Sequence, residues 1–124
     1  MPFRAIDKTS WPGDVVPNVL DYDAARAAFS WEGARRSLDG LPGGRGLNIA
    51  HEAVDRHAAG PLASKVALRW IRRDSSKTEA TYAELRASTN RFANVLCDLG
   101  VGKGDRVFTL LGRVPELYTV ALGT

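Results

Sequence analysis

The most regular hydrophobic pattern lies in the second half of the chain, where apolar and small side chains recur every three or four residues. The series is Tyr82, Leu85, Thr89, Phe92, Leu96 and Leu99. This spacing indicates one stripe of an amphipathic helix. Thr81 and Glu84 have the spacing of a capping box, in which the threonine accepts from the third helical N–H and the glutamate reaches back. Gly100 follows the last apolar position, and glycine is the residue that most often ends a helix.

Shorter patterns on either side of this helix predict β-strands. Apolar and other side chains alternate over residues 66–71, which is the period of a half-buried strand. Residues 73–76 are expected to form a turn, with residues 77–80 as the hairpin partner. Residues 107–111 form a mostly apolar run, which is typical of a strand buried on both faces. Pro115 is suited to the first turn of a following helix.

The order of these elements predicts the fold class. The second half reads strand–strand–helix–strand–helix, and a helix between strands is a crossover that implies parallel pairing in an α/β sheet. No further strand follows in the sequence. We therefore expect an α/β sheet that is incomplete within this chain.

The first half shows shorter and less regular patterns. Residues 1–20 carry Pro2, Pro12 and Pro17 without periodicity, and we interpret them as an extended arm that Phe3 and Trp11 could anchor. Two helices are expected over residues 21–39, the second capped by Ser30, with Tyr22, Phe29 and Trp31 as apolar anchors. A glycine-rich loop over residues 39–46 separates them from a short helix at residues 49–58, capped by Asn48.

Composition and charge exclude several classes of protein. The net charge is +3, but basic residues alternate with acidic ones, and the pairs Arg35-Arg36 and Arg72-Arg73 read as solvated surface rather than a nucleic-acid track. No stretch approaches the length of a membrane helix. Cys97 is the single cysteine, so an intrachain disulfide cannot form. We expect Cys97 to be a small packed residue on a helix, in a protein of the reducing cytoplasm.

Candidate chemistry is sparse. His51 and His57 are six residues apart on one predicted helix, whereas zinc pairs on helices are four apart, so we interpret both as surface histidines. The glycine clusters at residues 43–46 and 100–104 do not stand between a strand and a following helix, as a phosphate loop would. Six serines lack the context of a nucleophile elbow, since no G-x-S-x-G occurs: Ser30, Ser37, Ser64, Ser75, Ser76 and Ser88. The residues alone thus predict no catalytic, cofactor-binding or metal-binding site.

An ordered series of motifs nevertheless resembles a known superfamily. The series runs Thr81-Tyr82-Ala83-Glu84-Leu85, Asn90-Arg91-Phe92-Ala93-Asn94-Val95-Leu96, Leu99-Gly100-Val101-Gly102-Lys103-Gly104-Asp105-Arg106-Val107 and Pro115-Glu116-Leu117. It is similar to the opening block of AMP-forming adenylating enzymes. Upstream, Asp21-Tyr22-Asp23-Ala24-Ala25, Phe29-Ser30-Trp31-Glu32, Leu47-Asn48-Ile49-Ala50 and Ala53-Val54-Asp55-Arg56-His57 resemble the N-terminal extension of acetyl-CoA synthetases.

The resemblance implies an organisation and an activity. Residues 1–20 would be an arm, residues 21–60 the helical extension, and residues 61–124 the truncated start of an AMP-binding adenylation domain. The parent enzyme would convert a short carboxylic acid, acetate first, with ATP, Mg²⁺ and CoA to acyl-CoA, AMP and pyrophosphate in the cytoplasm. Its partners would be these small molecules and the remainder of its own adenylation domain.

The same resemblance implies that the chain by itself is inactive and binds no cofactor. In this family the phosphate-gripping loop and the catalytic lysine lie downstream of the opening block, so no site residue can be carried onto this sequence. Medium-chain and propionate ligases remain alternatives. A non-catalytic interaction domain that kept the family's opening segment is an alternative from another class.

Overall fold

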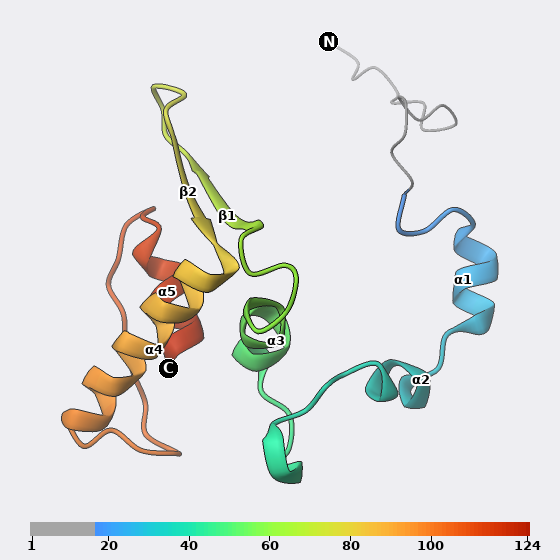
Figure 1. Cartoon of the computed structure of the whole chain (residues 1–124), viewed down its shortest axis with the longest axis horizontal. Helices are drawn as coiled ribbons and strands as arrows, with labels where there is room; N and C mark the ends of the chain where they lie inside the picture. Colours follow the sequence, from blue (N-terminus) through green and yellow to red (C-terminus); the bar gives the residue numbers. More distant parts are fainter. Residues whose placement is uncertain (1–16) are drawn as a thin grey trace. The chain divides into compact units, whose positions relative to one another are not determined.

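A computed structural model of the chain describes residues 17–124 (Figure 1). Residue contacts divide the chain into one unit that ends at Ser37 and a second unit, Leu38–Thr124. Helices and a two-stranded sheet occur together, which agrees with the predicted α/β class. Most of the expected arm over residues 1–20, including the proposed anchors Phe3 and Trp11, lies outside the described residues.

The first unit contains two short helices, α1 (Tyr22–Ala28) and α2 (Trp31–Arg36). Asp21 caps α1 by accepting a hydrogen bond from the backbone N–H three residues later, at 3.0 Å. Ser30 caps α2 in the same way, also at 3.0 Å, as the sequence predicts. In both helices the cap satisfies an N–H group that has no partner within the helix.

The aromatic residues of this unit do not act as buried anchors, so that expectation is wrong. Tyr22, Phe29 and Trp31 are 72%, 56% and 83% exposed. Phe29 and Trp31 contact each other edge to face, with ring centroids 5.1 Å apart. Two helices of this length offer too little surface to cover three large rings.

The second unit begins with the predicted loop and short helix. The loop contains a 3₁₀ turn, η1 (Pro42–Gly44). Asn48 caps the next helix through its Oδ1, which accepts from the His51 N–H at 2.9 Å, as predicted. This helix contains a π-helical stretch, η2 (His51–Asp55), and ends in α3 (Arg56–Ala58).

The predicted hairpin forms from β1 (Val66–Ile71) and β2 (Lys77–Thr81). The strands are antiparallel, with Val66 opposite Thr81 and Ile71 opposite Lys77. Ser75, at φ 65°, lies in the turn that joins them. Its left-handed backbone allows the tight reversal.

The long helix α4 (Tyr82–Asp98) has both predicted ends. Thr81 Oγ1 accepts from the Glu84 N–H at 3.2 Å, and Glu84 Oε2 accepts from the Thr81 N–H at 2.8 Å. Gly100 has φ +81°, and its N–H donates to the Cys97 carbonyl at 2.9 Å. The next N–H, of Val101, donates to the Leu96 carbonyl at 2.9 Å. These two bonds are the Schellman arrangement that satisfies the last carbonyls of a helix.

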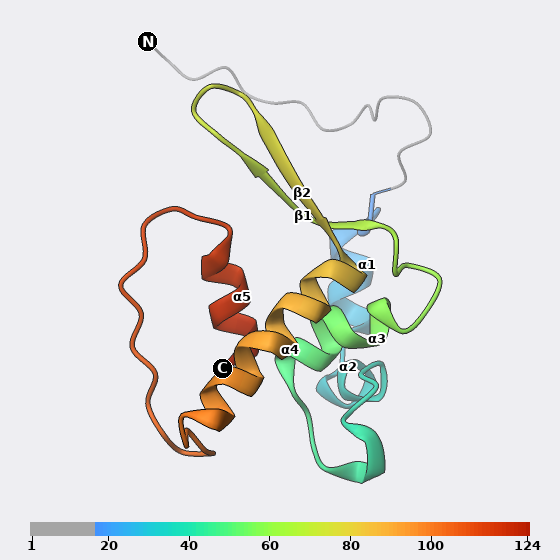
Figure 2. The ribbon, with the colours of Figure 1, turned by 60° about the vertical axis from the view of Figure 1, so that its left-hand side comes forward.

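A small core lies where α4 meets its neighbours. Figure 2 shows α5 (Glu116–Gly123) against one side of α4, and α4 also contacts η2, α3 and the hairpin. Among the described residues, the buried side chains are Val54, Leu85 and Thr89. The stripe of α4 is therefore buried in the first half of the helix, at Leu85 and Thr89, whereas Leu99 at its end is 74% exposed. The prediction that Leu99 belongs to the buried stripe is therefore wrong.

The third predicted strand does not form within the described chain. Residues 107–111 have no strand assignment, and the sheet contains β1 and β2 alone. Phe108 and Leu110 are 89% and 102% exposed. Strand structure requires a hydrogen-bonded neighbour, and neither β1 nor β2 pairs with this segment. The predicted parallel crossover is therefore absent from the described residues, and residues 107–111 belong to the coil that links α4 to α5 (Figures 1 and 2).

Candidate functional site

A polar cluster joins the glycine-rich loop to the π-helical segment. The Glu52 carboxylate accepts from the Gly40 N–H at 2.7 Å and from the Asp39 N–H at 3.1 Å. It also forms an ion pair with Arg56, one helical turn later, at 2.7 Å. The Glu52 side chain is only 14% exposed. Each of these groups donates a hydrogen bond to the Glu52 carboxylate, which therefore holds the loop against the helix. We call Glu52, Arg56 and the N–H groups of Asp39 and Gly40 the Glu52 clasp.

The environment of Glu52 favours its charged form. The hydrogen bond from Gly40 lowers the pKa of Glu52, partial desolvation opposes this, and the Asp39 N–H and Arg56 lower it further. A carboxyl group that serves as a general acid or base at neutral pH needs a raised pKa instead. Glu52 is therefore suited to a structural role.

His51 lies beside this clasp. Its side chain is 15% exposed, and its Nε2 is 3.5 Å from the Asp39 carboxylate. Nε2 is buried without a hydrogen-bond partner. The interpretation of His51 as a surface histidine is therefore wrong, because the loop that Glu52 holds also covers the imidazole.

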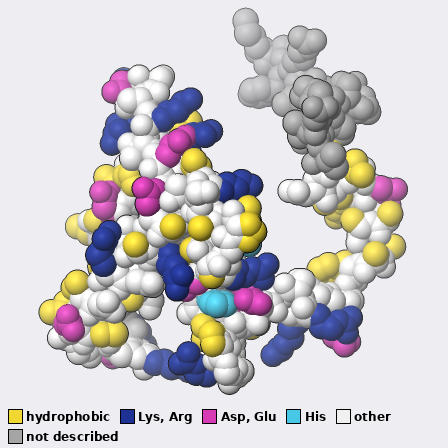
Figure 3. Space-filling view, in the orientation of Figure 1, with side chains coloured by type: hydrophobic (Ala, Val, Ile, Leu, Met, Phe, Trp, Pro, Cys, Tyr) yellow, Lys and Arg dark blue, Asp and Glu magenta, His cyan; other side chains and the backbone are white. Residues whose placement is uncertain are grey.

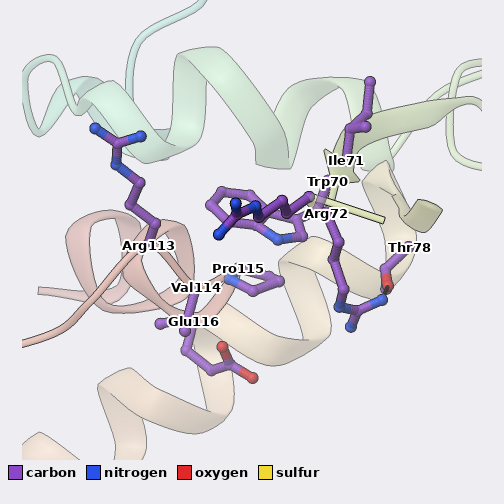
Figure 4. A pocket seen from close by; sticks show the side chains of 9 residues that line it. Trp70, Ile71, Arg72, Thr78, Arg113, Val114, Pro115 and Glu116 are labelled. Atoms are coloured by element: carbon purple, nitrogen blue, oxygen red, sulfur yellow. Dashed lines mark hydrogen bonds between the residues drawn. The ribbon is translucent and has the colours of Figure 1, made fainter. Parts of the chain in front are cut away.

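A hollow of about 870 Å³ lies between the hairpin and the start of α5 (Figure 4). Its lining residues are Trp70, Ile71, Arg72, Arg73, Thr78, Arg113, Val114, Pro115 and Glu116. Arg72 donates to Thr78 Oγ1 at 2.8 Å. Figure 4 shows the Trp70 ring between two arginines: Arg72 runs toward Thr78 on one side, and Arg113 lies on the other side and points away from the ring.

The hollow is basic but has no reactive constellation. Its lining contains three arginines and one acidic residue, Glu116. Within residues 17–124, neither Arg73 nor Arg113 takes part in an ion pair. Guanidinium groups cannot act as bases, and the lining has no histidine, cysteine or lysine. The diverging arginines also lack the convergent geometry that holds a phosphate.

The other residues considered from the sequence are dispersed. His57 contacts Tyr82, with ring centroids 5.2 Å apart, so it joins α3 to α4. Cys97 is exposed, and the expectation of a packed residue is wrong because its position on α4 faces away from the core. Among the described residues, no group of histidine, cysteine and acidic side chains could hold a metal ion.

The glycine clusters form turns, as predicted. Gly43 and Gly44 lie in η1 with φ of +74° and +70°, and Gly104 has φ +103°. The Gly102 N–H donates to the Asp105 carboxylate at 2.8 Å. Since that carboxylate occupies one N–H of the second cluster, this loop is closed by its own side chain and does not present a free anion cradle.

The resemblance implies ATP, Mg²⁺ and CoA as ligands of the complete enzyme, but the residues of the clasp, the hollow and the glycine clusters do not form a site for them. Glu52 and Glu84 bond backbone N–H groups, and the described chain offers neither an acidic cluster nor a glycine-rich loop that follows a strand. No step of the reaction can be derived through these residues.

No helix in the described range is long and apolar enough to cross a bilayer. On the face shown in Figure 3, basic and acidic side chains are interleaved.

Sequence reasoning missed both the clasp and the hollow. Glu52 and Arg56 have the spacing of a helical ion pair, so the sequence could have predicted their contact. The rest of the clasp, the backbone of Asp39 and Gly40, had no sequence signal. The hollow combines the Arg72-Arg73 pair with Arg113, and only the tertiary structure brings these segments together.

Comparison with known proteins places the chain in a family. A model of the family described as AMP-binding enzyme matches residues 54–124. The acetyl-coenzyme A synthetase of Bacillus subtilis (strain 168) is 40% identical over 108 residues, which are 86% of this chain and 18% of that protein. The 3-hydroxypropionyl-coenzyme A synthetase of Metallosphaera sedula is 38% identical over 90 residues, 69% of this chain and 14% of that protein.

A solved structure agrees with the sequence comparison. The Brucella canis acyl-CoA synthetase matches with a TM-score of 0.69 and 41% identity, over 82% of this chain and 18% of that chain. The chain thus spans less than a fifth of the length of the relatives it matches. Because the family match covers more than half of the residues, and relatives near 40% identity support it, this chain belongs to the AMP-binding enzyme family.

Proposed function

We propose that the chain is the N-terminal part of an AMP-forming acyl-CoA synthetase. The complete enzyme converts a short carboxylic acid, ATP and CoA to acyl-CoA, AMP and pyrophosphate. The observation that carries this proposal is the 40% identity with an acetyl-coenzyme A synthetase over 86% of the chain. A luciferase or peptide-synthetase adenylation domain would not be expected to share the upstream extension.

Within this proposal, the chain is a structural piece of the enzyme and is inactive alone. The absence of a convergent reactive group in the described hollow and clasp supports this role. The catalytic and cofactor-binding residues then belong to polypeptide outside this chain. Residues 21–60 are the helical extension and residues 61–124 the start of the adenylation domain, in a cytoplasmic enzyme.

Acetate is the proposed acid. Acetyl-coenzyme A synthetases from Bacillus subtilis and Leptospira biflexa are among the similar proteins. The Metallosphaera sedula relative, named for 3-hydroxypropionate, favours a slightly larger short acid as the second candidate. The residues that select the acid are not assigned to this chain.

The test provides the rest of an acyl-CoA synthetase as a second polypeptide. The chain is co-expressed with the part of the Bacillus subtilis enzyme that lies outside the matched region, and acetate-dependent exchange of labelled pyrophosphate into ATP is measured. We expect exchange with the pair, largest for acetate among acetate, propionate, 3-hydroxypropionate and octanoate. The chain alone should release no AMP above a protein-free blank.

Other outcomes redirect the proposal. Turnover by the chain alone would contradict the structural role. A preference for octanoate would indicate a medium-chain ligase. A stable pair without exchange for any acid would favour a non-catalytic interaction domain.

A further inference from the structure

The loop that the Glu52 clasp holds contains the one Asp-Gly pair of the sequence, Asp39-Gly40. At such a pair the backbone nitrogen of the glycine can attack the aspartate side chain, because glycine has no Cβ to shield its nitrogen. The Asp39 side chain is 64% exposed, and the residue belongs to no helix or strand. The Nε2 atom of His51 lies 3.5 Å from the Asp39 carboxylate but has no hydrogen-bond partner. The imidazole therefore does not fasten this carboxyl group.

The nitrogen of Gly40, in contrast, is held in place. The Gly40 N–H donates to Glu52 Oε1 at 2.7 Å, and the Asp39 N–H donates to Oε2 at 3.1 Å. Gly40 has φ +74°, and consecutive N–H groups that converge on one anion beside a left-handed residue form a nest. Attack on Asp39 needs a rotation that carries the Gly40 nitrogen away from Glu52 and onto the Asp39 Cγ. The two bonds to Glu52 resist this rotation.

We propose that Asp39-Gly40 is a site of spontaneous isoaspartate formation, and that the Glu52 clasp suppresses the reaction while the clasp is closed. When the loop opens, the Gly40 nitrogen forms a bond to the Asp39 Cγ, and one Cγ–O bond breaks. The departing oxygen leaves as water with the amide proton and the proton of the carboxyl group, and a succinimide ring remains. Water then adds to either ring carbonyl and breaks its bond to nitrogen, which gives aspartate or isoaspartate. The two steps lose and regain one water molecule, so they require no co-reactant.

Isoaspartate at position 39 keeps the clasp from closing again. The main chain then passes through the former side chain and gains one methylene between the N–H groups of residues 39 and 40. Two N–H groups separated in this way no longer match the two oxygens of the Glu52 carboxylate. The loop that covers His51 stays released, so the modification is a one-way switch. This inference concerns groups within the unit Leu38–Thr124 and does not depend on the proposed function.

Uptake of oxygen-18 measures the reaction, because each hydrolysis of the succinimide places one solvent oxygen in residue 39. The full chain is incubated in water enriched in oxygen-18, below the onset of unfolding seen by circular dichroism. Mass spectrometry then follows the label in the peptide that contains residue 39. We expect Glu52→Ala to raise the labelling rate by about tenfold or more, since it removes the acceptor of two charge-assisted hydrogen bonds and the loop opens more often.

Glu32→Ala is the matched control. It removes a glutamate that also pairs with an arginine one turn later, but on the surface of α2, and it should leave the labelling rate unchanged. In urea, where the clasp is lost, the parent and both variants should label equally fast. Gly40→Ala should label several-fold more slowly in urea, because its Cβ shields the nitrogen that attacks.

Each part of the proposal has an outcome that overturns it. Equal labelling of the folded parent and Glu52→Ala, or a folded parent that labels as fast as the chain in urea, would overturn suppression by the clasp. Failure of residue 39 to take up label in urea would overturn the site itself. The purified isoaspartate form tests the switch: its Gly40 amide should exchange hydrogen as fast as in Glu52→Ala, and an amide as protected as in the parent would overturn it.

Discussion

At the scale of single residues, Gly123 determines how closely two helices approach. A Cβ at this position would lie 2.7 Å from the Thr89 carbonyl oxygen and 3.1 Å from Phe92 Cδ1. The first of these is a backbone atom of α4, which cannot move without displacing the helix. Gly123 is therefore a packing residue at the contact between α4 and α5.

Replacing Gly123 by alanine should separate the two helices. We expect Gly123→Ala to destabilise their contact by about 1–3 kcal/mol, the usual cost of overpacking. The measurement is the loss of protection of α4 amides in hydrogen exchange. Gly112→Ala is the control, because a Cβ there would meet nothing within 4 Å, and equal effects of the two substitutions would contradict the close approach.

Gly100 acts through its backbone rather than its surroundings. It has φ +81°, and an added Cβ would meet nothing within 4 Å. We expect Gly100→Ala to cost about 1 kcal/mol from the left-handed conformation alone. Gly100→Asn should cost less, since asparagine tolerates that conformation. Thermal unfolding of the chain co-expressed with the remainder of an acyl-CoA synthetase, followed by circular dichroism, should show stability falling in the order glycine, asparagine, alanine. An alanine variant as stable as the parent would mean that α4 ends differently.

At the scale of elements, the Glu52 clasp fastens the loop over residues 39–46 to the helix that η2 and α3 form. The pKa of Glu52 is lowered in the folded chain, first by the Gly40 N–H. A lowered folded pKa means that the clasp contributes fully above the unfolded value of 4.5. Its contribution is lost as the pH falls through the folded value, because the protonated carboxyl accepts these bonds weakly.

The loop should therefore loosen in acid. We expect the amide of Gly40 to exchange faster, relative to the amides of α4, as the pH falls from about 6 to about 3. Glu52→Gln should loosen the loop at neutral pH and remove most of this pH dependence, since it also ends the ion pair with Arg56. Glu32→Gln is the control: its ion pair with Arg36 lies on the surface of α2 and should leave Gly40 unaffected. A pH response that persists in Glu52→Gln would show that another group controls the loop.

At the scale of the whole molecule, the described core is small. Val54 and Leu85 are the buried apolar residues among those described, and many large apolar side chains are exposed. Burial of apolar surface is the main favourable contribution to folding. A chain that buries so little should have low stability by itself.

We accordingly expect the isolated chain to melt over a broad temperature range. Co-expression with the remainder of an acyl-CoA synthetase should convert this to a sharp cooperative transition, because segment 107–111 and its neighbours then become covered. Calorimetry of both forms measures the difference. A sharp transition in the isolated monomer would show that its core suffices.

The sequence alone determined those features whose partners lie close along the chain. Ser30, Asn48 and the Thr81–Glu84 pair each bond a group three residues away, and Gly100 needs only its own backbone angle. The hairpin is equally local. The motif series from Thr81 to Leu117 also indicated the family, and it did so without predicting any site residue.

Only the tertiary structure decided the features that depend on distant segments. It covered His51 with the loop that Glu52 holds, left Cys97 and Leu99 exposed, and brought Arg113 beside Trp70. It also left residues 107–111 without a strand to pair with, although their pattern is that of an inner strand. Hydrophobic periodicity reports which positions are able to be buried, whereas burial itself requires a second surface. For residues 107–111 that surface is not among the described elements of this chain.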